Sequence, residues 1–327
     1  MKIPHVLMTA AMLTMFGGMA VAQETVSIGQ PAPNNEWTKR VYANTGINCA
    51  TPPVPVYYQG TDHTQVVYWA GLSRPDDVDD NGTGPFILME AFRHAANRYN
   101  KIFEKGQYFD CHPVREITDS NADNGMLRST EHPMQGMVYE FADSAAFRRA
   151  AEIDDDGFTW NGWGLRWLLS DEYLALRRPL DIQYFRDTDD ERCSLPENIV
   201  KRMEKKYGGK TERSRLTCAI GDDYGAGHIQ FFPKGGKCIA IEVVFSGDKI
   251  WSFTDVAENV NDMSMWHVDD GGEYFGIRPN MAFDGPEGLE ILYFEYAPES
   301  SSFGFVTLGQ GDKLMKHEIE GYYNYPE

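Results

Sequence analysis

The sequence lacks the short motifs that mark several common enzyme classes. It contains no C-x-x-C pair, no G-x-S-x-G nucleophile elbow, no P-loop and no credible glycine fingerprint for a dinucleotide. The pair His317-Glu318 has no second histidine to complete an H-E-x-x-H zinc motif, and the other histidines are scattered. These absences argue against a zinc knuckle, zinc-dependent hydrolysis and a thioredoxin-like redox pair, and we predict no metal site.

Basic residues are also scarce. The 327-residue chain carries 30 Lys and Arg against 49 Asp and Glu, which gives a formal net charge of −19. A surface of this sign repels nucleic acid and anionic lipid, because binding to either requires a basic footprint. We therefore expect no nucleic-acid partner. The one basic run, Lys201–Lys206, is interpreted as the solvated face of a helix.

No hydrophobic run is long enough to cross a bilayer comfortably. The mostly apolar stretch 6–19 follows a charged start and precedes an A-x-A sequence at Ala20–Ala22, which is the pattern of a secretory signal peptide and its cleavage site. The sequence therefore predicts a signal peptide over residues 1–22 and a mature chain that starts at Gln23. It also predicts a secreted or periplasmic protein without a transmembrane segment.

Cysteine is sparse, and disulfide bonds are the default expectation for an exported protein. Because the number of cysteines is odd, the simplest expectation is two bridges and one free thiol, with the connectivity left open. The five cysteines are Cys49, Cys111, Cys193, Cys218 and Cys238.

The first two thirds of the chain mix several kinds of predicted element. Residues 23–55 are rich in Pro, Asn and Thr and are interpreted as an extended arm. Apolar residues at helical spacing predict a helix from Pro85 to Lys105. The remaining predictions are strands at Val66–Trp69 and Met137–Phe141, a loop at Gln107–Asn124 and a short helix at Ser144–Ile153.

A second composition begins near Thr217 and is typical of β-structure. Ser246-Gly247-Asp248 has the composition of a hairpin connection between the first two predicted strands. The strands are predicted at Ile239–Phe245, Lys249–Phe253, Leu289–Tyr296 and Phe303–Leu308.

One acidic run has part of the pattern of a calcium-binding loop. Asp77–Gly82 places oxygen donors at positions one, three and five and then a glycine, as in an EF-hand. Position twelve, however, is Leu88, where a bidentate glutamate is required. We therefore favour a solvated acidic turn over a calcium site.

Five short stretches follow one another over roughly residues 66–205. They are Val67–Pro75 with its continuation to Gly82, Arg128–Thr130, Tyr139–Asp143, Asp171–Arg178 and Leu195–Ile199. In this order they resemble segments of the pertussis-toxin-like ADP-ribosyltransferases. The segments are the opening strand and loop, the Ser-Thr-Ser strand, the next strand with its Ala-Asp turn, the segment of the catalytic glutamate, and the Pro-Glu-Asn-Ile that follows it.

The resemblance implies a mono-ADP-ribosyltransferase that uses NAD as a substrate and transfers ADP-ribose to a protein acceptor, with a delivery subunit as a further partner. Glu172 would be the catalytic carboxylate and Arg74 an NAD-binding arginine, while Ser129 and Thr130 would support the pocket and Tyr68 would be scaffold beside it. Cleavage of the nicotinamide–ribose bond develops an oxocarbenium ion, which a carboxylate stabilises. An arginine can bind the pyrophosphate with two donors.

Three departures from the family pattern keep a rival hypothesis open. Trp69 stands where the family has its key arginine, Glu131 stands where it has a third hydroxyl, and about sixteen residues are inserted before Leu195. The rival is a non-catalytic exported binding protein whose acidic loops bind calcium or a basic partner.

The sequence predicts an α+β fold, in which an ADP-ribosyltransferase-like mixed core is followed by a β-rich C-terminal region. After the signal peptide (1–22) and the extended arm (23–55), we expect the transferase-like domain at 56–215 and the β-rich domain at 216–327.

Overall fold

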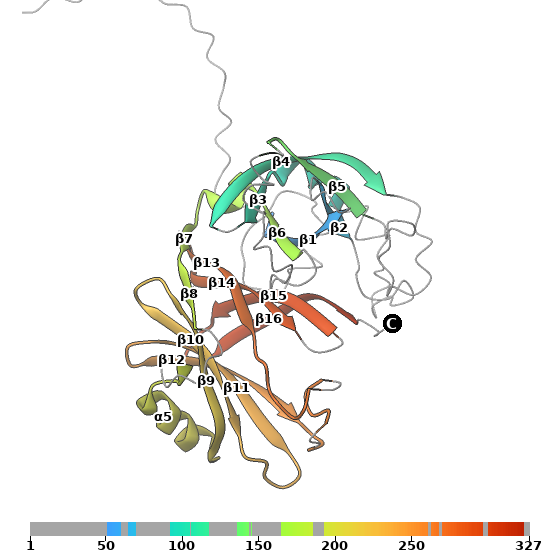
Figure 1. Ribbon diagram of the computed structural model, residues 1–327. Helices are drawn as coiled ribbons and strands as arrows, with labels where there is room; N and C mark the ends of the chain where they lie inside the picture. The colour runs from blue at the N-terminus through green and yellow to red at the C-terminus, as the bar shows by residue number, and fades with distance from the viewer. Residues whose placement is uncertain are drawn as a thin grey trace, which may run out of the picture. The chain divides into compact units, whose positions relative to one another are not determined.

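Antiparallel strands form most of the chain that the computed structural model describes (Figure 1). The described residues are 51–59, 65–69, 92–104, 106–117, 136–143, 145, 165–185, 193–260, 263–267, 270–296 and 300–323, all within one compact unit that spans Pro31–Glu327. The predicted fold class was wrong. The protein is mostly β-sheet, in curled antiparallel sheets, and does not have an α+β mixed core.

The helix predicted at Pro85–Lys105 accounts for part of this correction. In its described part, residues 92–93 are helical and a single 3-10 turn, η1 (Ala96–Arg98), follows before strand β3 (Lys101–Glu104) begins. The apolar stripe is buried all the same, because a turn and a strand bring the same side chains to the core. The buried residues of this stripe are Phe92, Ala95, Ala96, Tyr99 and Ile102.

The segment predicted as a loop at Gln107–Asn124 is the second part of the correction. Residues Gln107–Ile117 form the long strand β4, of which only Cys111 and Ile117 are buried. The register shifts between Pro113 and Arg115, where the strand pairs with β5. A mostly exposed strand with an internal proline at an irregularity carries little apolar alternation, so its sequence looks like a loop.

The first six strands close into a barrel. Their order around the barrel is β1-β2-β5-β4-β3-β6, and every neighbouring pair is antiparallel. The strands not yet given are β1 (Val54–Gln59), β2 (Gln65–Trp69), β5 (Gly136–Phe141) and β6 (Leu165–Leu169).

The remaining strands form two five-stranded antiparallel sheets. One has the order β12-β11-β10-β9-β8 and the other β16-β15-β14-β13-β7. The strands are β7 (Arg178–Leu180), β8 (Ile182–Tyr184), β9 (Thr211–Ile220), β10 (Tyr224–Phe231), β11 (Cys238–Ser246), β12 (Lys249–Ala257), β13 (Arg278–Gly285), β14 (Gly288–Tyr296), β15 (Ser300–Leu308) and β16 (Leu314–Tyr323). The expected domain boundary after residue 215 lies within β9.

The sheet that contains β14 is covered on both faces. Leu292 and Phe294 belong to the core shared with the barrel, where the ring of Phe294 stacks on Trp167 at 5.6 Å. Ile291 and Tyr293 belong to the core shared with the other sheet. Successive residues of a strand point to opposite faces, so burial of both faces explains the nearly continuous apolar sequence of β14.

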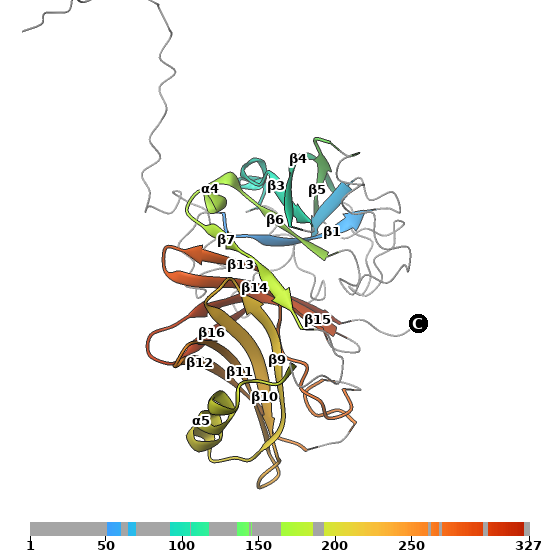
Figure 2. The ribbon, with the colours of Figure 1, turned by 60° about the vertical axis from the view of Figure 1, so that its left-hand side comes forward.

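Helix α5 (Glu197–Tyr207) covers the outer face of the sheet that contains β9 to β12 (Figure 2). Ile199 and Met203, four residues apart, are its buried residues and pack on this sheet. Gly208, at φ 66°, adopts the left-handed conformation that ends the helix. The basic run Lys201–Lys206 lies in this helix, and its four basic residues are exposed, as predicted.

Several predicted elements are confirmed. Strands occur at all six predicted strand positions, and Ser246 pairs with Lys249 across a turn in which Gly247 has φ 55°. The signal peptide, the arm up to residue 50, the Asp77–Gly82 loop and all but one residue of the Ser144–Ile153 helix lie outside the described residues. Among the described helices, none is long and apolar enough to span a membrane.

Three of the described cysteines, Cys111, Cys218 and Cys238, are buried free thiols. The two disulfide bridges expected from the sequence would need at least two of these three residues. In the described part of the chain, no disulfide bridge involves Cys111, Cys218 or Cys238.

Candidate functional site

The predicted catalytic residue Glu172 lies in a one-turn helix, α4 (Asp171–Leu174), directly after strand β6. Ser170 caps this helix, because its hydroxyl accepts a 3.0 Å hydrogen bond from the main-chain N–H of Tyr173. Asp171 and Glu172 then occupy the first turn, where the helix dipole favours negative charge. The cap fixes where the helix starts and therefore where the Glu172 side chain leaves the backbone.

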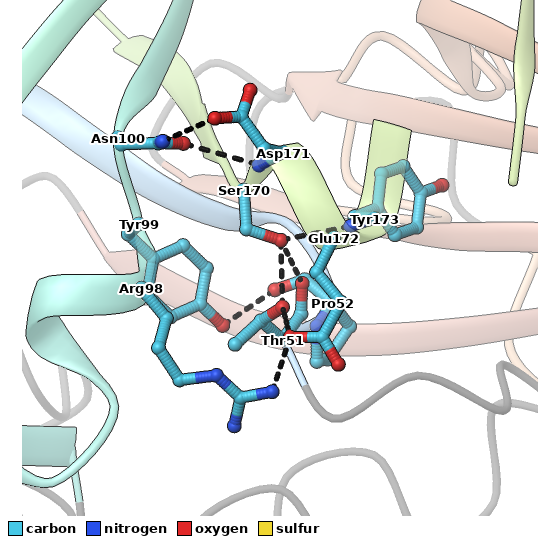
Figure 3. Close-up of polar contacts among 9 residues, drawn as sticks. All are labelled: Thr51, Pro52, Arg98, Tyr99, Asn100, Ser170, Asp171, Glu172 and Tyr173. Atoms are coloured by element: carbon cyan, nitrogen blue, oxygen red, sulfur yellow. Dashed lines mark hydrogen bonds and ion pairs between the residues drawn. The ribbon is translucent and has the colours of Figure 1, made fainter. Parts of the chain in front are cut away.

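The Glu172 carboxylate is half-buried and contacts two other segments (Figure 3). Its Oε2 atom forms an ion pair with the guanidinium of Arg98, and the Thr51 hydroxyl donates to the same atom at 3.4 Å. The Glu172 side chain keeps 38% of its surface exposed and that of Arg98 34%. A small molecule can therefore reach both groups of this pair.

The floor of the site is a buried hydrogen-bond network that joins residues 51–52 to the end of β6. The hydroxyls of Thr51 and Ser170 lie 2.6 Å apart, and both residues have no exposed surface. Tyr99 donates its hydroxyl to the main-chain oxygen of Pro52 at 2.7 Å. Buried polar groups that all have partners hold their neighbours in one arrangement, so the backbone beneath Glu172 is held from two sides.

The neighbouring carboxylate, Asp171, points away from this floor. Asn100 donates to its Oδ2 atom at 2.6 Å, and the amide N–H of Asp171 donates to Asn100 Oδ1 at 3.1 Å (Figure 3). The Lys101 ammonium lies 3.5 Å from Asp171 and also pairs with Asp110, and the hydrogen bond with Asp110 is the main cause of its raised pKa. Adjacent residues of the same helix thus have different partners and exposures.

A buried ion pair anchors the C-terminal side of α4 to strand β14. Arg177 binds both carboxylate oxygens of Glu290, at 2.6 and 2.9 Å, and the Tyr173 hydroxyl donates to the same carboxylate at 2.7 Å. The side chains of Arg177 and Glu290 are only 1% and 3% exposed. The Arg177 guanidinium also lies 3.9 Å from the centre of the Tyr173 ring. This anchor begins one residue after Glu172.

Of the predicted site residues, only Glu172 has a described side chain. Tyr68 is a residue of β2 and pairs with Met137 of β5. Arg74, Ser129 and Thr130 lie outside the described residues.

Sequence reasoning missed Arg98 and Thr51, the described residues whose side chains contact the Glu172 carboxylate. Arg98 was assigned to a long helix and Thr51 to an extended arm, and they lie 74 and 121 residues before Glu172. No local sequence signal connects positions at such separations.

Comparisons were made with family models, curated proteins and solved structures, and no match was found.

The chemistry of the site follows from its residues. A half-exposed carboxylate can accept hydrogen bonds from sugar hydroxyls or stabilise a developing positive charge. A half-exposed guanidinium can bind a phosphate or carboxylate group with two donors. Among the described residues, no group of three or more His, Cys, Asp or Glu side chains is arranged to hold a metal ion.

Proposed function

We propose that the protein is an exported, toxin-like mono-ADP-ribosyltransferase that cleaves the nicotinamide–ribose bond of NAD and transfers ADP-ribose to a protein. The observation that carries the proposal is the half-exposed Glu172 carboxylate beside the half-exposed Arg98, above a buried floor. The ordered sequence motifs support the same activity. The proposal does not depend on an α+β core, because fold alone does not determine function.

In this proposal Glu172 stabilises the reacting ribose. As the bond between C1′ and the nicotinamide nitrogen breaks, nicotinamide leaves with the electron pair and positive charge develops on the ribose. The negative charge of Glu172 opposes this positive charge. A nucleophilic side chain of the acceptor protein then bonds to C1′ and loses its proton.

Arg98 has a second role in the proposal. Its guanidinium is paired with Glu172. The pyrophosphate of NAD offers a guanidinium a doubly charged, bidentate partner. Transfer of Arg98 from Glu172 to the pyrophosphate would leave the carboxylate available to the ribose. Arg74, which the family resemblance assigns to NAD, is the second candidate for this contact.

The experiment compares two neighbouring carboxylates. Glu172→Gln removes the charge and keeps the size, so NAD binding measured by calorimetry should persist while NAD glycohydrolysis falls by about two to three orders of magnitude. Asp171→Asn is the matched control, because Asp171 lies in the same turn and its side chain is 65% exposed. The control should keep activity within a few-fold of the unchanged protein.

Arg98→Lys separates binding from chemistry. A lysine keeps the charge but loses the bidentate fork, so the Michaelis constant for NAD should rise more than the turnover number falls. Full activity of Glu172→Gln would contradict the assignment of this carboxylate. An unchanged protein that neither binds nor cleaves NAD would contradict the proposed activity as a whole.

One observation favours the second candidate, a non-catalytic exported binding protein. A groove of about 480 Å³ is lined by β7, β8, the turn that follows β9, and one residue each of β13 and β14, and four carboxylates line it. They belong to Asp181, Asp222, Asp223 and Asp284, of which Asp284 pairs with Arg178. Salt-dependent binding of a lysine-rich peptide, together with no binding of NAD, would support this candidate.

A further inference from the structure

The segment Asp270–Ile277 leads into strand β13 and lies over strands β10 and β11. Its first residue is fixed locally, since the Asp270 carboxylate accepts main-chain hydrogen bonds from Met265 and Gly272 at 3.0 and 2.8 Å. Its middle is fixed by Gln230 of β10, which donates to the Gly272 oxygen at 3.0 Å and accepts from the Tyr274 amide at 2.9 Å. We call this segment the strap.

The far end of the strap is held by a buried acid, Glu242 of β11, which is 2% exposed. The Ile277 amide donates to Glu242 Oε1 at 2.8 Å, and the Tyr274 hydroxyl lies 3.1 Å from the same oxygen. Gly276, at φ +67°, fits closely here, because an added Cβ would lie 2.7 Å from Nδ1 of His228 and 2.8 Å from the Glu242 carboxylate. No side chain fits between the strap and the sheet at this point.

Several other charged or titratable groups face Glu242. Asp255 of β12 accepts a hydrogen bond from the same Tyr274 hydroxyl, and the charge of Glu295 of β14 also acts on Glu242. The ammonium of Lys316, on β16, is 3.0 Å from Glu295 and 4.0 Å from Asp255. His228 of β10 completes the set. Among the described residues that act on Glu242, Lys316 is therefore shared by three carboxyl groups, those of Glu242, Asp255 and Glu295.

The number of protons shared by Glu242, Tyr274 and Asp255 decides whether each contact between their oxygens is a hydrogen bond. The Tyr274 hydroxyl has one proton and can donate it to only one of its two carboxyl neighbours. If Glu242 is protonated, its own hydroxyl donates to the Tyr274 oxygen while Tyr274 donates to Asp255, and each contact has a proton. If Glu242 is ionised, the Tyr274 hydroxyl donates to only one of the two carboxylates. The other contact then brings two oxygens together with no proton between them.

Burial also favours the protonated form of Glu242. It raises the pKa of Glu242 from 4.5 to about 8, with further effects from Lys316, which lowers it, and Glu295, which raises it. Burial also raises the pKa of Tyr274 well above 10, so the phenol keeps its proton throughout this range. The protonated form of Glu242 therefore belongs to the closed strap.

We propose that the strap Asp270–Ile277 is a pH-sensitive closure, held down by the proton on Glu242 and released as Glu242 ionises. In the open form Glu242 meets water and recovers an ordinary acidity. Opening then releases one proton between the open-state pKa of about 4.5 and the closed-state value of about 8. The population of the open form should rise about tenfold per pH unit within this window and level off above it.

The test is hydrogen exchange of the strap amides between pH 5.5 and pH 7.5, corrected for the intrinsic pH dependence of exchange. The full chain should show about a hundredfold more strap opening at the higher pH. Glu242→Gln, which imitates the protonated acid in size and charge, should show little change between the two. Glu258→Gln, at an exposed glutamate paired with Lys237, is the matched control and should behave like the unchanged protein.

A second variant keeps the test decisive if Glu242→Gln folds poorly. Asp255→Asn removes the charge that opposes ionised Glu242, and its 30% exposed side chain tolerates the change. The pH effect on the strap should then be smaller than in the unchanged protein. Strap exchange that does not depend on pH, or a Glu242→Gln variant with the full pH effect, would overturn the proposal. The proposal would also be overturned if pH changed the exchange of the β11 amides as much as that of the strap amides.

Discussion

The buried ion pair between Arg177 and Glu290 gives a prediction whose size can be worked out from the structure. Both side chains are almost without exposed surface, and Glu290 accepts three hydrogen bonds, two from Arg177 and one from Tyr173. Glu290→Gln leaves the guanidinium buried without an anion. It also turns an amide N–H toward groups that are themselves donors.

The expected cost of Glu290→Gln is about 3–5 kcal/mol of unfolding free energy, the range for removing one partner of a buried pair. This is a large part of the 5–15 kcal/mol that stabilises a typical domain. Replacing both residues, as in Arg177→Met with Glu290→Leu, removes both charges together. The double variant should therefore regain most of the lost stability, because a packed apolar pair avoids the desolvation cost of the ions.

The neighbouring pair Arg178–Asp284 is a matched control. It joins the same sheet between β7 and β13, but its side chains are 71% and 55% exposed. Asp284→Asn should cost less than about 1 kcal/mol. Urea unfolding followed by tryptophan fluorescence measures the three variants and the unchanged protein. Equal losses from Glu290→Gln and Asp284→Asn would refute the argument that burial makes the first pair important.

Two further predictions concern packing and thiols. Gly304→Ala should cost about 1–3 kcal/mol or more, because an ideal Cβ would lie 1.9 Å from a main-chain oxygen of β16; thermal unfolding measures this loss, and an unchanged melting temperature would contradict it. Cys111, Cys218 and Cys238 should resist a thiol reagent at pH 8 until the protein unfolds, since burial raises the pKa of all three, to about 12 for Cys218. Rapid labelling of all three in the folded protein would contradict their burial.

Local sequence patterns identified many strands correctly. Leu289–Tyr296 and Ile239–Phe245 are rich in β-branched and aromatic residues and each adjoins a glycine-containing turn, and each forms a strand. The same kind of reasoning failed for Gln107–Ile117, whose barrel strand is mostly exposed and therefore lacks apolar alternation. It also failed for Ala96–Glu104, where residues at helical spacing became buried through a turn and a strand.

The candidate site likewise has some features that local sequence indicates and others that only the fold creates. The sequence singled out Glu172 from its neighbours, and the serine before Asp171 is a local capping signal that the backbone uses. The ion pair of Arg98 with Glu172, the Thr51–Ser170 contact and the anchor on Glu290 join residues that are 74 to 119 positions apart. Each depends on which strands pair, and pairing between distant segments is not encoded in any short stretch.

By itself, the sequence determined where many strands lie and singled out the carboxylate of Glu172. The tertiary structure decided the fold class, because a mixed α+β core and curled antiparallel sheets can be built from similar apolar stretches. It also decided how the acids behave. Glu172 is half-exposed beside an arginine, whereas Glu242 is buried and faces two other carboxylates and one lysine. The charge state of an acid depends on burial and neighbours, and distant strands supply both.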